Sequence, residues 1–167
     1  MKTGEVWKQR PESGNTAIGH EYWFDNGERI GYHGRRLPEE KYHFFGTIKR
    51  DNTGKVECDF PFHCTHFSGR GMEYALGDGR PANVQPWFPS EGKPFLILLK
   101  WEENKGNYTG PRILANHRST FNFTHPHATF TPDKEYVLYS SDVTGYSQLY
   151  LVEVGDFYDL PELEDYL

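Results

Sequence analysis

The chain has 167 residues and a formal net charge of −6, from 24 acidic and 18 basic side chains. This length suits one domain of ordinary size, and the acidic balance argues against a nucleic-acid groove, which needs clustered Lys and Arg. No apolar run approaches the roughly 20 residues of a membrane span, and no charged-then-apolar leader opens the chain. Two cysteines are too few to stabilise a domain of this size by disulfides. We therefore expect a cytoplasmic protein without nucleic-acid or membrane partners.

The composition favours strands over helices. Aromatic residues make up 16% of the chain, and 17 Gly and 11 Pro interrupt it at short intervals. Aromatic side chains are enriched in strands, and Gly and Pro supply the turns between them. The sequence therefore predicts an all-β fold of many short strands, as in a sandwich, a barrel or a propeller, and not a helical bundle.

A repeated pattern divides most of the chain into three segments. Each has a His-containing lead, an aromatic strand, a polar turn with Gly or Asp, and further apolar strands. The leads at His20, His66 and His125 are spaced like propeller repeats, which run about 40 to 50 residues, with insertions lengthening the second interval. We expect three four-stranded blades, at residues 16–57, 58–118 and 119–155.

The rest of the chain is expected to be irregular. Residues 1–15 are interpreted as an incomplete strand or leader, and residues 156–167 as an acidic tail that is solvated. Within the second blade, residues 80–93 are a Pro/Gly-rich insertion, residues 102–110 are interpreted as a loop, and Gly77-Asp78-Gly79 as a hairpin turn.

Three blades do not close a ring, since propellers carry about 4 to 8 blades. The sequence therefore predicts a partial β-propeller whose open sheet edges need a partner. We expect that partner to be the missing blades on another chain or a second copy of this one, as in a truncated or split gene product.

The pair His125 and His127 is the most informative local motif, because it enters a strand that is expected to run from His125 to Phe130. In an extended strand alternate side chains share one face, so the two imidazoles are expected to point the same way. Two imidazoles a few ångströms apart are the arrangement that one metal ion requires.

Three motifs, in this order, resemble the C-terminal blades of the oligogalacturonate lyase family over about residues 16 to 155. They are Gly19-His20-Glu21-Tyr22-Trp23, Cys64-Thr65-His66 followed by Gly-Asp-Gly, and Thr124-His125-Pro126-His127 followed by the Ser141-Asp142 turn. Members of this family are seven-bladed propellers that cleave short pectin fragments, usually the digalacturonate, by β-elimination. They use a manganese ion held by three His and one Gln.

The resemblance implies roles for individual residues. His66, His125 and His127 match the histidine ligands of the manganese ion, and Asn122 stands where the family has its glutamine ligand. Asn offers the same amide oxygen on a shorter stem. His20 matches a further active-site histidine near the substrate. The arginine that acts as base in the family would precede the first residue of this chain, so no residue is assigned to it.

Other residues are recommended by residue type alone. An arginine could hold a substrate carboxylate, a tryptophan could stack on a sugar ring, and Asp78 could orient a histidine ligand. Surface charge, core packing and turn formation explain the same residues more simply. They are Arg35, Arg36, Arg112, Trp23, Trp87, Trp101 and Asp78, with His33, His43, His63 and His117.

Two other functions stay open on the sequence. A non-catalytic propeller module for binding or assembly is consistent with the missing base and with Asn122. A cupin-like metal barrel also uses His-x-His with a distant histidine, but places the pair first, whereas His66 precedes the pair here.

Overall fold

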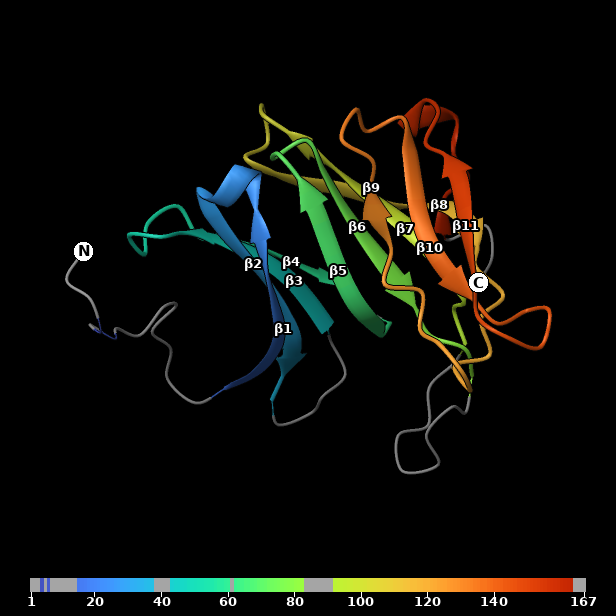
Figure 1. Cartoon of the computed structure of the whole chain (residues 1–167). Coiled ribbons are helices and arrows are strands. Elements are labelled where there is room, and N and C mark those ends of the chain that lie inside the picture. Colours follow the sequence, from blue (N-terminus) through green and yellow to red (C-terminus); the bar gives the residue numbers. More distant parts are fainter. Residues whose placement is uncertain are drawn as a thin grey trace.

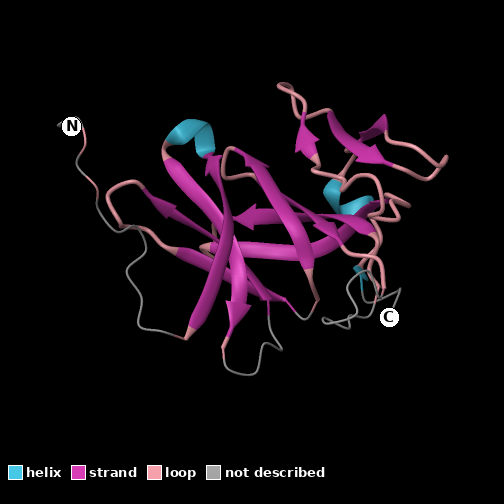
Figure 2. Ribbon diagram, turned by 60° about the horizontal axis from the view of Figure 1, so that its bottom comes forward, coloured by secondary structure: helices cyan, strands magenta, loops and turns pink. Residues whose placement is uncertain are grey.

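The computed structural model describes residues 4, 6, 15–37, 43–60, 62–82 and 92–163. Within them the strands form three separate antiparallel sheets, and the helical pieces are two short 3-10 turns (Figures 1 and 2). This confirms the all-β, partial-propeller expectation and rules out a single cupin-like barrel. The predicted leader, 1–15, lies almost wholly outside the described residues.

Each sheet is a meander in which strands follow one another in chain order. We call the sheets blades one, two and three. Blade one contains β1 (Thr16–Phe24), β2 (Arg29–Arg36), β3 (His43–Lys49) and β4 (Val56–Phe60), with the turn η1 (Asp25–Gly27) after β1. Blade two contains β5 (Cys64–Arg70), β6 (Tyr74–Gly79), β7 (Phe95–Glu102) and β8 (Asn107–Asn116). Blade three contains β9 (Thr129–Phe130), β10 (Tyr136–Ser141) and β11 (Gln148–Glu153).

Three local predictions were wrong. Blade three has three strands in the described part of the chain, where four were expected. Strand β8 begins at Asn107, inside the predicted loop 102–110, because the turn after β7 is tight and the chain pairs again at once, Glu102 with Asn107. Gly77-Asp78-Gly79 is not a hairpin turn but the end of β6, where Asp78 pairs with both His66 and Leu96.

Blade two forms the centre of the core because its strand β7 is buried on both faces. The run Leu96-Ile97-Leu98-Leu99 is 0% exposed, the continuous apolar pattern of a strand covered on both sides. Alternate residues of β7 belong to two different clusters. Toward blade one lie Phe24, Phe45, Phe67, Ala75, Ile97 and Leu99. Toward blade three lie Leu76, Leu96, Leu98, Phe130 and Val137.

The first strands of the blades lie next to one another. β1 contacts β5 and β5 contacts β9, and Figure 1 shows the three strands in this order. Gly69 on β5 permits part of this approach, since a Cβ there would collide with the ring of Phe24 on β1. The histidine-containing segments that begin the three repeats are thereby brought to one region.

The described part of the acidic C-terminal segment, 156–163, keeps its carboxylates exposed but packs apolar side chains against the blades. Its turn η2 (Phe157–Asp159) buries Phe157 to 2% exposure in the cluster between blades two and three. Arg112 of β8 donates hydrogen bonds to the carbonyl oxygens of Tyr158 and Leu160, at 3.0 and 2.7 Å, and forms an ion pair with Glu162. Burial of Phe157 and the contacts with Arg112 together hold this segment against the blades.

We predict that Phe157→Ala lowers the free energy of unfolding by about 3–5 kcal/mol, because it removes a large side chain from a filled core. Tyr158→Phe, which removes one exposed hydroxyl at the next position, should change it by less than about 1 kcal/mol. Urea unfolding followed by circular dichroism measures both. Equal stability of the two variants would show that the segment does not contribute to the core.

Candidate metal centre

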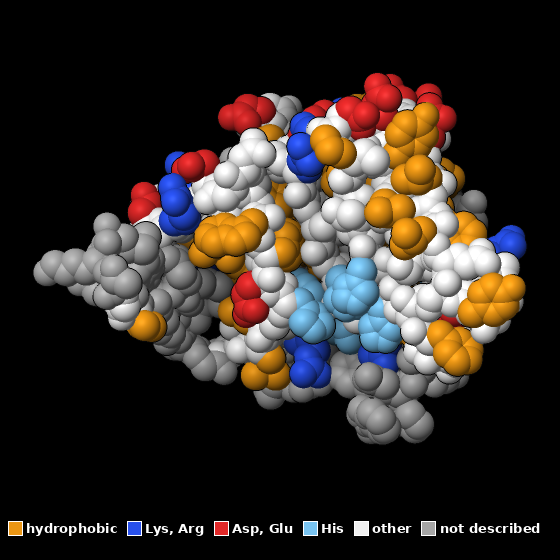
Figure 3. Space-filling view, viewed as in Figure 1, with side chains coloured by type: hydrophobic (Ala, Val, Ile, Leu, Met, Phe, Trp, Pro, Cys, Tyr) orange, Lys and Arg blue, Asp and Glu red, His pale blue; other side chains and the backbone are white. Residues whose placement is uncertain are grey.

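Three imidazoles from two blades meet at the junction of the first strands. One ring nitrogen each of His66, on β5, and of His125 and His127, before β9, lie within 4.8 Å of one another. The ring centroid of His66 is 3.7 Å from that of His127 and 5.5 Å from that of His125. Figure 3 shows histidine side chains gathered in the middle of one face, with Lys or Arg side chains directly below them.

The geometry of this cluster fits a divalent cation. Metal–imidazole bonds of about 2 Å place the donor atoms of one ion within about 4 Å of one another, less than 1 Å closer than they lie here. Imidazole nitrogens suit a range of divalent transition metals, and a thiolate would shift the preference toward zinc. Both cysteines are free thiols, and Cys64 is buried in the core between blades one and two.

Asp78 positions this cluster. It is 1% exposed, and one of its carboxylate oxygens lies 2.9 Å from His66 Nδ1. The carboxylate also accepts hydrogen bonds from the backbone N–H groups of His66, at 2.6 Å, and His127, at 3.0 Å. A carboxylate bonded to one ring nitrogen fixes the tautomer and leaves the other nitrogen for a metal. The sequence suggested this role for Asp78 only as one option beside a turn.

The prediction that His125 and His127 lie in a strand was wrong. The two-residue strand β9 starts after them, and His127 has φ of 45°, so strand alternation is not what brings the rings together. The backbone N–H of His127 is instead fixed by Asp78. The rings still lie on one side, with centroids 6.0 Å apart.

Asp142 holds the loop that leads to this pair. It is 2% exposed and accepts hydrogen bonds from the side chains of Ser119 and Thr120 and from the backbone N–H groups of Thr120 and Phe123. Burial by itself raises the pKa of Asp142, but these hydrogen bonds outweigh it and hold the pKa well below its usual range. The sequence motif contained Asp142 but gave no sign of this task.

Two of the three imidazoles are prepared for metal binding by their surroundings. Burial, and then the neighbouring His66, lower the pKa of both His125 and His127. A lowered pKa favours the neutral ring, the form in which imidazole donates a lone pair to a metal.

His20, on β1, lies beside the cluster. Its ring centroid is 5.3 Å from that of His66, and its Nδ1 lies 2.8 Å from the carbonyl oxygen of Thr65. Since a carbonyl oxygen only accepts, His20 Nδ1 carries the hydrogen. The side chain is exposed, so its other ring nitrogen is the one available to a ligand.

No contact among the described residues joins Asn122 to the cluster. It is exposed in the loop before His125, and its backbone N–H bonds to Thr120 Oγ1. Phe121, one residue earlier, stacks on the ring of His125 with centroids 4.4 Å apart. Whether Asn122 is a ligand stays a prediction.

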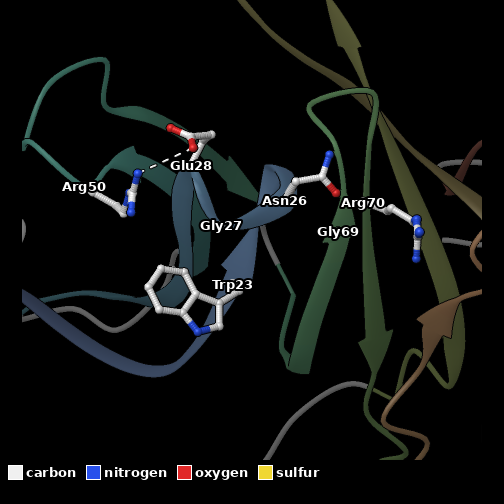
Figure 4. Close-up of a pocket in the computed structure, with 7 residues that line it drawn as sticks. All are labelled: Trp23, Asn26, Gly27, Glu28, Arg50, Gly69 and Arg70. Atoms are coloured by element: carbon white, nitrogen blue, oxygen red, sulfur yellow. Dashed lines mark hydrogen bonds and ion pairs between the residues drawn. The ribbon is translucent and has the colours of Figure 1, made fainter.

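The other residues considered from the sequence lie elsewhere. Arg112 anchors the C-terminal segment, and Trp101 packs edge-on against Tyr108, with centroids 5.2 Å apart. Trp87 lies outside the described residues. Trp23 is 69% exposed at a hollow of about 600 Å³ beside η1 and the end of β5 (Figure 4). No histidine lines that hollow within the described chain.

A second group of histidines adjoins the cluster. His20, His33, His43 and His63 line a cavity of about 450 Å³, together with Arg35 and Arg80. Burial, and then the neighbouring imidazoles, lower the pKa of His33 and of His63 to about 3. Nothing but residue type had recommended His33, His43 and His63 in the sequence, because only the fold brings β2, β3 and the chain before β5 together here.

The fold and the cluster together define part of a β-propeller with a candidate metal centre at the junction of its first strands. No protein-family model matches the chain. Two curated proteins are 29% identical to it over 147 residues, an oligogalacturonate lyase of Dickeya dadantii and an oligogalacturonide lyase of Pectobacterium atrosepticum. The match covers 82% of this chain but 37% of each relative, so the chain spans little more than a third of their length.

Solved structures show the same fold. An oligogalacturonate lyase in complex with manganese has a TM-score of 0.69 at 21% identity, over 92% of this chain and 39% of that one. An oligogalacturonate lyase of Vibrio parahaemolyticus has a TM-score of 0.72 at 22% identity, over 93% of this chain and 40% of that one. The resemblance seen in the motifs is therefore confirmed: most of this chain is similar to oligogalacturonate lyases. Among the described residues, no helix has the length and apolar character needed to cross a membrane.

We predict that the free energy of unfolding falls as the pH is lowered from about 6.5 toward about 3. The pKa values of His33 and His63 are lowered in the folded protein, so in this window the unfolded chain binds more protons and acid favours unfolding. The stabilisation is fully present above about pH 6.5. Urea unfolding at steps across the window measures the slope, and His63→Gln should reduce it. An identical slope in both proteins would contradict the prediction.

Proposed function

We propose that this chain carries the metal-binding part of an oligogalacturonate lyase-like propeller and takes part in the metal-dependent β-elimination of short oligogalacturonates such as digalacturonate. The convergence of His66, His125 and His127 carries the proposal. The names of the curated relatives and the manganese complex among the solved structures support it. Manganese is the ion we propose, with Asn122 as a fourth ligand.

The reaction explains why such a site needs a cation. Removal of the C5 proton of a uronate spreads negative charge into the adjacent carboxylate, where a bound divalent cation supplies Lewis-acid stabilisation. In this chain, His66, His125 and His127 would hold that ion through ring nitrogens. Asp78 would keep His66 in the tautomer that binds it, through the contact of 2.9 Å to Nδ1.

We propose that His20 acts on the substrate directly. Because its Nδ1 hydrogen is engaged by Thr65, a neutral His20 ring presents a lone pair at Nε2. Beside the cation this atom could accept or return a proton during elimination. The base that removes the C5 proton is not assigned to a residue of this chain.

A second candidate function is a non-catalytic assembly module. Tyr136, Leu149 and Leu151 on β10 and β11 are 40%, 71% and 64% exposed, and β11 ends the described part of its sheet. Exposed apolar side chains on a sheet edge favour pairing with further blades or with a second copy. A metal-loaded chain that self-associates without eliminating digalacturonate would favour this function.

We predict that purified protein retains manganese after dialysis and that His127→Ala lowers its manganese affinity at least about 100-fold. Removing a residue that hydrogen-bonds to a metal ligand already lowers metal affinity about 10–100-fold, and removing the ligand itself lowers it further. Atomic spectroscopy of dialysed protein and calorimetric titration measure it. Asn122→Ala tests the fourth ligand in the same assay. Unchanged affinity in His127→Ala would remove the basis of the proposal.

We predict that His20→Ala lowers kcat for digalacturonate about 10²- to 10⁴-fold, the usual contribution of a proton-transfer group, and leaves manganese affinity within about twofold. Formation of the unsaturated or keto-sugar product follows the reaction. The unchanged metal affinity separates a role in proton transfer from a role in the cluster. If manganese-loaded wild-type protein forms no product, the chain alone is not the lyase.

A further inference from the structure

We propose that the cavity lined by His20, His33, Arg35, His63 and Arg80 binds the carboxylate-bearing ring of a second uronate residue, next to the one held at the candidate metal centre. The assignment of this ligand as the second residue of the substrate rests on the proposed function. The cavity volume of about 450 Å³ is within the range of small-ligand pockets, about 300–1,000 Å³.

The cavity adjoins the candidate metal centre directly. His20 lines it and also lies beside the cluster, with its ring centroid 5.3 Å from that of His66 and 5.1 Å from that of His33. A linear acidic sugar held at the candidate metal centre by one residue would reach this cavity with the next. His20 would contact both residues.

The charged side chains among the described residues of the cavity are arginines. Arg35 and Arg80 line it, and none of the described residues that line it is acidic. Arg80 is 4% exposed, and although burial lowers its pKa, a guanidinium remains protonated in proteins. A guanidinium in a recess suits a planar carboxylate, which it can hold by two parallel hydrogen bonds.

The histidines add neutral hydrogen-bonding groups. Burial keeps His33 and His63 uncharged at pH 7, because it lowers the pKa of each to about 3. Arg80 Nη1 donates to His63 Nδ1 at 3.3 Å, so the hydrogen of His63 is on Nε2. His33 Nδ1 is buried and has no hydrogen-bond partner in the described part of the chain. A sugar hydroxyl is the kind of group that would satisfy such an atom.

The cavity is therefore built to distinguish an acidic sugar from a neutral one. The buried guanidinium selects the carboxylate, and the imidazoles suit hydroxyl groups. This would make Arg35 and Arg80 determinants of substrate specificity that lie outside the metal-binding residues. Arg36, the next residue on β2, faces the other way: it pairs with Glu57 and Asp59, at 3.0 and 2.7 Å.

The test uses protein from which metal has been removed, so that the candidate metal centre does not hold the ligand. D-galacturonate and neutral D-galactose are titrated into it and followed by NMR and calorimetry. We expect galacturonate to bind at one site and galactose to bind at least about tenfold more weakly. Arg35→Gln and Arg80→Gln should each weaken galacturonate binding about tenfold or more, the loss of about 1.4 kcal/mol of a charged hydrogen bond.

Arg36→Gln is the matched control, since it removes the same charge from the same strand and should bind galacturonate like the wild type. Arg80 is buried, so its variant counts only if its circular dichroism and unfolding match those of the wild type. If the Arg80 variant does not match the wild type, Arg35→Gln alone provides the test. Wild-type affinity in folded Arg35→Gln, or equal binding of galacturonate and galactose by the wild type, would overturn the proposal.

Activity separates this proposal from the lyase function. If manganese-dependent elimination of digalacturonate occurs and is unchanged in Arg35→Gln and Arg80→Gln, the lyase function stands and the second uronate site is wrong. If arginine-dependent galacturonate binding is found without any elimination, the acidic-sugar site stands and the lyase function of this chain is wrong.

Discussion

The buried carboxylate of Asp78 connects the two segments that carry the histidine cluster. Asp78 sits at the end of β6, accepts a hydrogen bond from the backbone of His66 on the neighbouring strand, and contacts the ring of the same residue. It also accepts the backbone N–H of His127, which belongs to the next repeat. Burying a carboxylate is costly unless hydrogen bonds compensate, and within the described chain the compensating bonds come from His66 and His127. The fold and the cluster therefore depend on each other.

The core explains why this junction is stable. Blade two presents alternate residues of β7 to the blades on its two sides, so neither neighbour can shift without exposing apolar surface. Asp142 fixes the loop before His125 through hydrogen bonds from Ser119, Thr120 and Phe123. The histidines thus lie on supports that are fixed independently, one by sheet packing and one by a buried turn, which is the preorganisation that a ligand site needs.

The sequence was sufficient for the class of fold and for the residues that converge. The repeats placed His20, His66 and His125 at corresponding positions, and the resemblance to oligogalacturonate lyases indicated His66, His125 and His127, whose ring nitrogens the structure brings together. Strand alternation could not predict how the histidine rings come together. His127 adopts a left-handed backbone conformation, and its backbone N–H is held by Asp78.

Long-range contacts account for the other failures. The C-terminal segment was expected to be solvated because of its acidic side chains, yet Phe157 packs in a core made by residues far away in the chain. The cavity lined by His33, His63 and Arg80 combines residues from two blades, and no local pattern marks them as neighbours.

The doubly covered strand β7 also bears on how the chain must be handled. Phe95 to Leu99 is an uncharged run of strand-forming or large apolar residues without Pro or Gly, the kind of segment that stacks into intermolecular β-structure when it is exposed. Only the two neighbouring sheets keep it from solvent. Any treatment that separates the blades before they have all formed, such as refolding from denaturant at high concentration, will therefore favour aggregation through this segment.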